Sequence, residues 1–340
     1  MGSGQLNPSL DKPPAGAIRK ARRLCACLLL SWVASACQEP DANRTWELAS
    51  QGIYDGAFST TADLVVIGSL NHGASLWRTL ENERLYTWSH EAGQTLELTA
   101  ASISPDGSRA VTADARTLVL WDTSSGQALQ YWATPGKVLD AAVFNDNRHT
   151  LLGLDDHSAL LFDAFTGAYQ QTLLHKGEVG AVSLSRDGSM ALTGSDDETA
   201  KLWRLNDGAE LQSFLHGNPV RAVVLSPRGT YSFTAAQGDL VALWDNANGN
   251  RLHTLHQDLY HGVVCAAFSE DETLLAVGYA DRRISLFSVA TGTELHTWRP
   301  TTRHRWRATG AAILAVGFHG SINALLALTG DGRLLELRRS

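Results

Sequence analysis

The sequence predicts an all-β fold assembled from seven repeats of four short strands. Three observations carry this prediction: a repeat of about 41 residues, thirty glycines together with ten tryptophans, and only two methionines. Hydrophobic residues make up 44% of the 340 residues and charged residues 19%, so a predominantly disordered chain is excluded.

Each repeat contains an apolar strand that alternates with period two and carries a bulky residue, which we call the third-strand anchor. The anchors are Trp77, Trp121, Phe162, Trp203, Trp244, Phe287 and Leu337. Eleven residues after each of the first six anchors stands another bulky apolar residue, which places a fourth strand there. Nearly all variation in repeat length falls between this fourth strand and the next first strand. One class of loops is therefore variable, whereas the other turns are short.

The repeats resemble those of the WD-repeat family of β-propellers, from about Arg44 to the C-terminus. The fourth repeat matches the family's structural hydrogen-bond tetrad with His175, Thr193, Asp197 and Trp203. The resemblance implies a seven-bladed β-propeller. The acid of the tetrad is missing where Ala115 and Gly238 stand, so packing must supply more of the rigidity in those two blades.

The last repeat lacks a fourth strand of its own, because only three residues follow Leu337. The segment that starts Arg44-Thr45-Trp46 reads like the fourth strands elsewhere in the chain. An unpaired edge strand invites aggregation. We therefore expect Arg44–Ser50, with Thr45 and Trp46, to pair with Leu334–Arg338 and to close the last blade.

Small residues stand three positions before the expected end of nearly every first strand. This column is Asp55, Ala100, Ala141, Ala181, Ala222, Cys265 and Ala315. Seven innermost strands converge on an axis, where small side chains fit best. We interpret Cys265 as a small buried residue in this column, not as a reactive thiol.

Residues 1–36 are typical of a secretory signal peptide. Basic residues precede Leu24–Ala36, an uncharged run too short to span a bilayer. Val33–Cys37 resembles the lipobox of bacterial lipoproteins. This resemblance implies a lipidated Cys37 and a short tether over residues 37–43, after which the repeats of the propeller occupy residues 44–340. It also implies a place on the periplasmic side of the outer membrane; ordinary cleavage, giving a soluble periplasmic protein, is the alternative. The segment before Arg19 is long for a signal, so the start codon can lie downstream.

The charge balance argues against nucleic-acid binding. Beyond residue 36 the chain holds 23 Lys and Arg residues against 34 Asp and Glu residues. The sequence shows no catalytic elbow, phosphate loop or metal-ligand spacing. We therefore predict no catalytic residue, no metal and no cofactor, and contact with a membrane through the lipid anchor alone.

One segment departs from its acidic surroundings. The longest variable loop carries Arg303, His304, Arg305, Trp306 and Arg307. Arg and Trp are enriched at binding hot spots, and the Arg fork matches carboxylate and phosphate groups. These five residues are the candidate partner-binding site; a solvated loop without a binding role is the alternative.

The function that follows by family analogy is a non-enzymatic scaffold for protein partners in the bacterial cell envelope. Two alternatives remain open at this point. The first is a hydrolase or lactonase that uses the central channel, for which Asp55 and Asp140 are the acids to inspect. The second is a periplasmic ligand sensor.

Overall fold

The computed structural model describes residues 1–2, 42–69, 73–90, 98–255, 262–301, 312–320 and 323–338. The chain divides into two compact units, Met1–Asp41 and Ala42–Ser340. Within the described residues, the second unit contains 28 strands arranged as seven four-stranded antiparallel sheets.

Six of these sheets, or blades, each use four consecutive strands. The first three blades are formed by β2 (Ile53–Phe58), β3 (Leu64–Ser69), β4 (Gly73–Arg78) and β5 (Glu83–Trp88); β6 (Ala100–Ile103), β7 (Arg109–Asp114), β8 (Thr117–Asp122) and β9 (Ala128–Ala133); and β10 (Val138–Val143), β11 (His149–Leu154), β12 (Ser158–Asp163) and β13 (Tyr169–Leu174).

The next three blades follow the same order. They are formed by β14 (Val179–Leu184), β15 (Met190–Ser195), β16 (Thr199–Arg204) and β17 (Ala209–Leu215); β18 (Val220–Leu225), β19 (Tyr231–Ala236), β20 (Val241–Asp245) and β21 (Arg251–Thr254); and β22 (Val263–Phe268), β23 (Leu274–Tyr279), β24 (Ile284–Ser288) and β25 (Glu294–Trp298).

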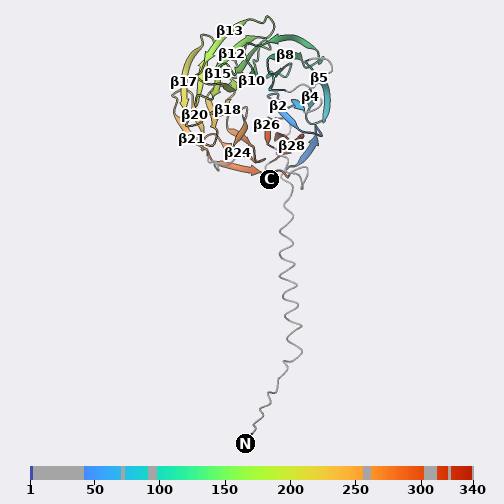
Figure 1. Ribbon diagram of the computed structural model, residues 1–340, viewed down its shortest axis with the longest axis vertical. Helices are drawn as coiled ribbons and strands as arrows, with labels where there is room; N and C mark the ends of the chain where they lie inside the picture. The colour runs from blue at the N-terminus through green and yellow to red at the C-terminus, as the bar shows by residue number, and fades with distance from the viewer. Residues whose placement is uncertain are drawn as a thin grey trace. The chain divides into compact units, whose positions relative to one another are not determined.

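The blades form a closed ring around a central channel. Figure 1 shows β2, β10, β18 and β26 nearest the centre and β5, β13, β17 and β21 on the outside. Each first strand contacts the first strand of the next blade, and β26 contacts β2. The sequence-based prediction of a seven-bladed β-propeller is therefore confirmed.

The seventh blade combines the two ends of this unit. It consists of β26 (Ile313–His319), β27 (Ala324–Thr329), β28 (Arg333–Leu337) and β1 (Arg44–Glu47). β1 runs antiparallel to β28, with Thr45 opposite Leu335 and Trp46 opposite Leu334. The N-terminal strand thus closes the last blade as the sequence predicted, although β1 ends at Glu47 and not at Ser50.

Aromatic side chains fill the spaces between neighbouring blades. Trp88 of β5 stacks on Trp121 of β8 in the next blade, with ring centroids 4.8 Å apart. Phe214 of β17 stacks in the same way on Trp244 of β20, at 4.7 Å. The side chain on the fourth strand therefore packs against the anchor of the following blade, and both belong to one apolar core that the two blades share.

We expect the ring to depend on β1. Deleting residues 1–47 removes the strand that covers β28, whereas deleting residues 1–41 leaves it in place. The longer deletion loses the β1–β28 hydrogen bonds and the packing of Trp46, so we expect the free energy of unfolding to fall by about 3 kcal/mol. Urea unfolding and size-exclusion chromatography of the two deletion variants measure this. Equal urea midpoints and equal elution would contradict the closure.

Candidate functional site

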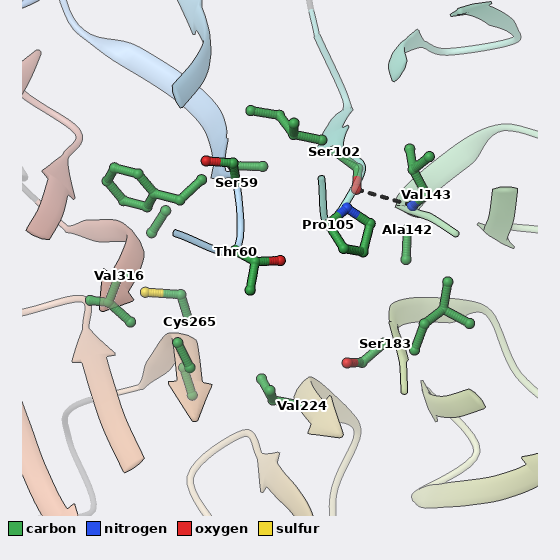
Figure 2. Close-up of a pocket in the computed structure, with 18 of the residues that line it drawn as sticks. Ser59, Thr60, Ser102, Pro105, Ala142, Val143, Ser183, Val224, Cys265 and Val316 are labelled. Atoms are coloured by element: carbon green, nitrogen blue, oxygen red, sulfur yellow. Dashed lines mark hydrogen bonds between the residues drawn. The ribbon is translucent and has the colours of Figure 1, made fainter. Parts of the chain in front are cut away.

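The first strands surround a cavity of about 460 Å³ along the axis of the ring. Figure 2 shows side chains from several blades facing this space, among them Ser102, Ser183, Val224, Cys265 and Val316. Most of the wall is formed by small or aliphatic residues. This channel is the candidate functional site, because it is a concave site built by every blade.

Two carboxylates also line the channel, and one of them corrects the sequence analysis. Asp140 pairs with Gly153 across the blade, just as Ala181 pairs with Gly194 in the next blade. The expectation that Ala141 occupies the small-residue column is therefore wrong. β10 ends at Val143, one residue earlier than the repeat spacing suggested, so Asp140 takes this position.

Both carboxylates bond to the backbone of the next blade. The Asp140 Oδ2 atom accepts a hydrogen bond of 2.8 Å from the Val182 N–H. The carboxylate of Asp55 accepts one from the Ala101 N–H in the same manner. Each acid therefore joins its own first strand to the following one.

Two serines accept the same kind of backbone hydrogen bond at the blade boundaries that the aspartates do not join. The Ser102 Oγ atom accepts a hydrogen bond of 3.2 Å from the Val143 N–H, which Figure 2 marks with a dashed line. The Ser183 Oγ atom accepts one of 3.0 Å from the Leu225 N–H. Polar side chains thus connect the first strands of the first five blades, alternating between aspartate and serine.

The position of the two acids makes ionisation costly. Burial raises the pKa of Asp55 to about 6, although backbone N–H groups partly oppose the shift. Burial likewise raises the pKa of Asp140 to about 7, and the charge of Asp55 adds to this effect. Both side chains keep some solvent exposure through the channel. Both carboxyl groups therefore keep their proton to a higher pH than an ordinary aspartate does, while still serving as backbone acceptors.

The thiol in the channel has a structural contact as well. Burial raises the pKa of Cys265 to about 12, so the reactive thiolate is scarce at neutral pH. Its Sγ atom lies 3.4 Å from the Ile313 carbonyl oxygen of the next blade. In the part of the chain that the structure describes, no group of three or more His, Cys, Asp or Glu side chains could hold a metal ion.

The four residues of the tetrad in the fourth blade lie together. The Trp203 Nε1–H donates to the Thr193 hydroxyl at 2.8 Å, and this hydroxyl lies 2.7 Å from His175 Nε2. Since Trp can only donate, the hydroxyl hydrogen is free to point at His175, whose Nδ1–H then donates to Asp197 at 3.1 Å. Burial lowers the pKa of His175, so the neutral ring that this chain of bonds needs is favoured.

A second complete tetrad exists in the second blade, and the sequence analysis missed it. Trp121 and His90 both bond to Thr112, at 2.8 Å each, and His90 lies 3.2 Å from Asp114. The acid is seven residues before the anchor here instead of six, because Asp114 is the last residue of β7, whereas Asp197 lies in the turn that follows β15. His90 lies two residues after the end of the preceding fourth strand, and this position could have revealed the tetrad from the sequence.

The fifth blade has only part of this arrangement. Trp244 donates to Thr234 at 2.7 Å, and the ring of His216 lies edge-on to Trp244. Gly238 stands where the acid would be, as the sequence indicated, and among the residues that the structure describes no carboxylate bonds to His216.

The remaining site residues taken from the sequence lie outside the described residues. These are Cys37 and the basic segment from Arg303 to Arg307. Among the described residues there is no helix long and apolar enough to cross a membrane.

Two family models match parts of the chain. The model of the WD40 domain of anaphase-promoting complex subunit 4 matches residues 231–321, and the model of the WD domain, G-beta repeat, matches residues 167–204. No curated protein matches the chain. Over these two stretches the chain is similar to WD40 repeats, in agreement with the seven-bladed ring.

We expect the buried carboxylate of Asp140 to make stability depend on pH. Its folded pKa lies above that of an unfolded aspartate, so its contribution to stability is complete below about pH 4 and is lost as the pH rises through 7. The variant D140N should therefore gain stability relative to the wild type by about 2–4 kcal/mol between pH 4 and pH 8. Urea unfolding of both proteins over this range measures the difference in stability. The titration of the buried histidines is common to both proteins and does not contribute to this difference.

The variant D106N is the control for this experiment. Partial burial favours a higher pKa at Asp106, but hydrogen bonds from Ser104, Ser108 and Asn147 lower it to about 2. The difference between D106N and the wild type should therefore be constant from pH 4 to pH 8. A constant difference for D140N as well would show that its folded pKa is ordinary.

Thr193 and Thr234 each accept a hydrogen bond from a tryptophan N–H, so substituting them one at a time allows a matched comparison of stability. T193V leaves both the Trp203 N–H and the His175 nitrogen without their partner, whereas T234V affects only the Trp244 N–H. We expect T193V to cost about 2–4 kcal/mol and T234V about 1–2 kcal/mol, since each buried group left unsatisfied is costly. Urea midpoints at pH 7 measure both, and equal losses would contradict a joined tetrad.

Proposed function

We propose that this propeller is a non-enzymatic scaffold that holds protein partners at the bacterial cell envelope. WD40-repeat propellers typically serve as protein-interaction scaffolds. The observation that carries the proposal is the use of the channel's polar groups. Asp55, Ser102, Asp140 and Ser183 all bond to the backbone of the next blade. They stiffen the ring, and recognition is left to its turns and loops.

The basic segment is the proposed docking site for a partner. Residues Arg303–Arg307 belong to the connection between β25 and β26, which is the longest of the variable loops. A cluster of Arg residues with one Trp suits a partner that presents carboxylates beside an apolar surface. The remaining chain is acidic, so this loop would direct such a partner to one side of the ring.

The lipid anchor at Cys37 is part of the same proposal. The propeller unit begins at Ala42, only five residues later. A tether of this length spans less than about 20 Å when extended. A lipidated Cys37 would therefore hold the ring close to the periplasmic face of the outer membrane.

A channel enzyme is the second candidate, and the two raised pKa values of Asp55 and Asp140 favour it. A carboxyl group with a pKa near 7 can act as a general acid or base at neutral pH. Both carboxylates, however, already accept backbone hydrogen bonds. Hydrolysis of a glycoside or lactone by the purified protein that D140N abolishes would support this candidate over the scaffold.

The scaffold is tested by partner capture from detergent-solubilised membranes. Three proteins are compared: the wild type, C37S, and the variant in which Arg303, Arg305 and Arg307 are all changed to Ala. We expect the triple variant to lose specific captured proteins, because it loses three guanidinium groups at the docking site. We expect C37S to keep them when mixed with the same extract but to fractionate with the soluble periplasm of the producing cells.

The outcomes separate the parts of the proposal. An unchanged set of captured proteins in the triple variant removes the basic loop as the docking site. C37S that stays in the membrane fraction removes the lipid anchor. A wild type that captures nothing specific removes the scaffold itself.

A further inference from the structure

A carboxylate is present beside the histidine of the fifth blade, but it bonds to the backbone. Asp239 follows Gly238 in the turn between β19 and β20. Its Oδ2 atom accepts a hydrogen bond of 2.7 Å from the Gly217 N–H, in the connection between β17 and β18. His216 precedes Gly217, and its buried ring has no hydrogen-bond partner at either nitrogen. The acid therefore holds the backbone beside the imidazole and leaves the imidazole itself unbonded.

The fourth blade shows the effect of placing the acid one residue earlier. There the Asp197 Oδ2 atom lies 3.1 Å from His175 Nδ1 and also accepts a hydrogen bond of 2.8 Å from the Lys176 N–H. One carboxylate oxygen thus serves the imidazole and the following backbone N–H together. In the fifth blade a Cβ at Gly238 would meet no atom within 4 Å, so the place of the tetrad acid is open. Asp239, one residue later, serves only the backbone N–H.

Asp239 is also the carboxylate whose charge acts on His216. Burial lowers the pKa of His216, the charge of Asp239 and the Leu240 carbonyl raise it, and the charge of Arg251 on β21 lowers it. The adjoining turn and first strand carry charged side chains that are exposed or paired with each other: Glu198, Asp196 and Arg221. When His216 takes up a proton, Asp239 is therefore its acceptor.

We propose that Asp239 exchanges its hydrogen-bond donor when the pH falls, leaving the Gly217 N–H and pairing with the protonated ring of His216. A buried imidazolium without an acceptor is costly, and this cost drives the exchange. Gly217 is exposed, so water can replace the carboxylate at its N–H. Asp239 is half-buried and stands in a turn, so its side chain has room to reorient. The inference does not depend on the proposed scaffold function.

The exchange loosens the connection between β17 and β18. Two further backbone bonds hold this connection: the His216 N–H donates to the Glu198 carbonyl, and the Gln237 N–H donates to the Pro219 carbonyl. Loss of the bond at Gly217 removes the contact between them. Connections from a fourth strand to the next first strand also include the basic segment, so acidification alters the loop face of the ring. The fourth blade needs no such exchange, because its acid already bonds to both groups.

The test follows two backbone amides of the full chain by NMR between about pH 8 and pH 5. Glycine, lysine and histidine are labelled with ¹⁵N, and the variants G217A and K176R assign the two amide signals. We expect the Gly217 amide proton to move upfield with the same midpoint as the protonation of the His216 ring. The Lys176 amide should stay in place, because hydrogen bonds hold the pKa of Asp197 at about 2 despite its burial.

Four variants separate the parts of the exchange. H216Q removes the titrating ring and D239N removes the charge of the acceptor, so each should abolish the movement of the Gly217 amide. H175Q is the matched control in the fourth blade and should leave that movement unchanged. G238D supplies the ring with its own carboxylate, in a left-handed conformation that aspartate tolerates. It should raise the pKa of His216 and keep the Gly217 amide in place.

The outcomes decide the proposal even if one variant fails to fold. Joint titration of Gly217 and His216 that H216Q, D239N or G238D removes supports it. A Gly217 amide that does not move, or that moves as far in the folded variants, overturns it. A His216 ring that stays neutral until the protein unfolds overturns it as well. Equal movement of the Lys176 amide would also overturn it, because acid would then act on both blades alike.

Discussion

The pairing of β1 with β28 is the contact on which the rest of the structure depends. It gives the seventh blade its fourth strand and brings Trp46 against the core that contains Trp77 of the first blade. Without that strand, the interface between the seventh and first blades would lack the side that the seventh blade contributes. Because each apolar core lies between two neighbouring blades, an incomplete interface weakens both of its neighbours. Closure is thus the condition under which seven similar sheets share one rigid channel.

Two sets of polar contacts hold the blades in this ring. Near the axis, aspartates and serines of one first strand accept hydrogen bonds from N–H groups of the next, which satisfies these backbone donors. Farther out, the tetrads of the second and fourth blades join a tryptophan, a threonine, a histidine and an aspartate. The inner contacts carry a cost, because Asp55 and Asp140 must lose solvation to make them. The burial of Asp55 and Asp140 between neighbouring first strands therefore both stiffens the channel and disfavours the ionisation of these two carboxyl groups.

Closure by two chain ends makes the seventh blade differ from the others. In blades two to six, a turn between the third and fourth strands lies over the preceding blade, whereas β28 and β1 have none between them. A pocket of about 810 Å³ lies beside this interface and is lined by Trp298 and Leu337, although both side chains are almost fully buried.

The sequence by itself determined the repeat, the strand order, the number of blades and the strand that closes the ring. These follow from periodicity and spacing, which are local properties of the chain. It could not place Asp140 in the channel or find the tetrad acid Asp114, because a shift of one residue within a repeat reverses the face of a strand. Only the tertiary structure decided that the charge of Asp55 acts on Asp140 across the channel, and that Trp298 shares an apolar core with Leu337 of the next blade. Both depend on distances between separate blades, and a linear pattern of residues does not contain them.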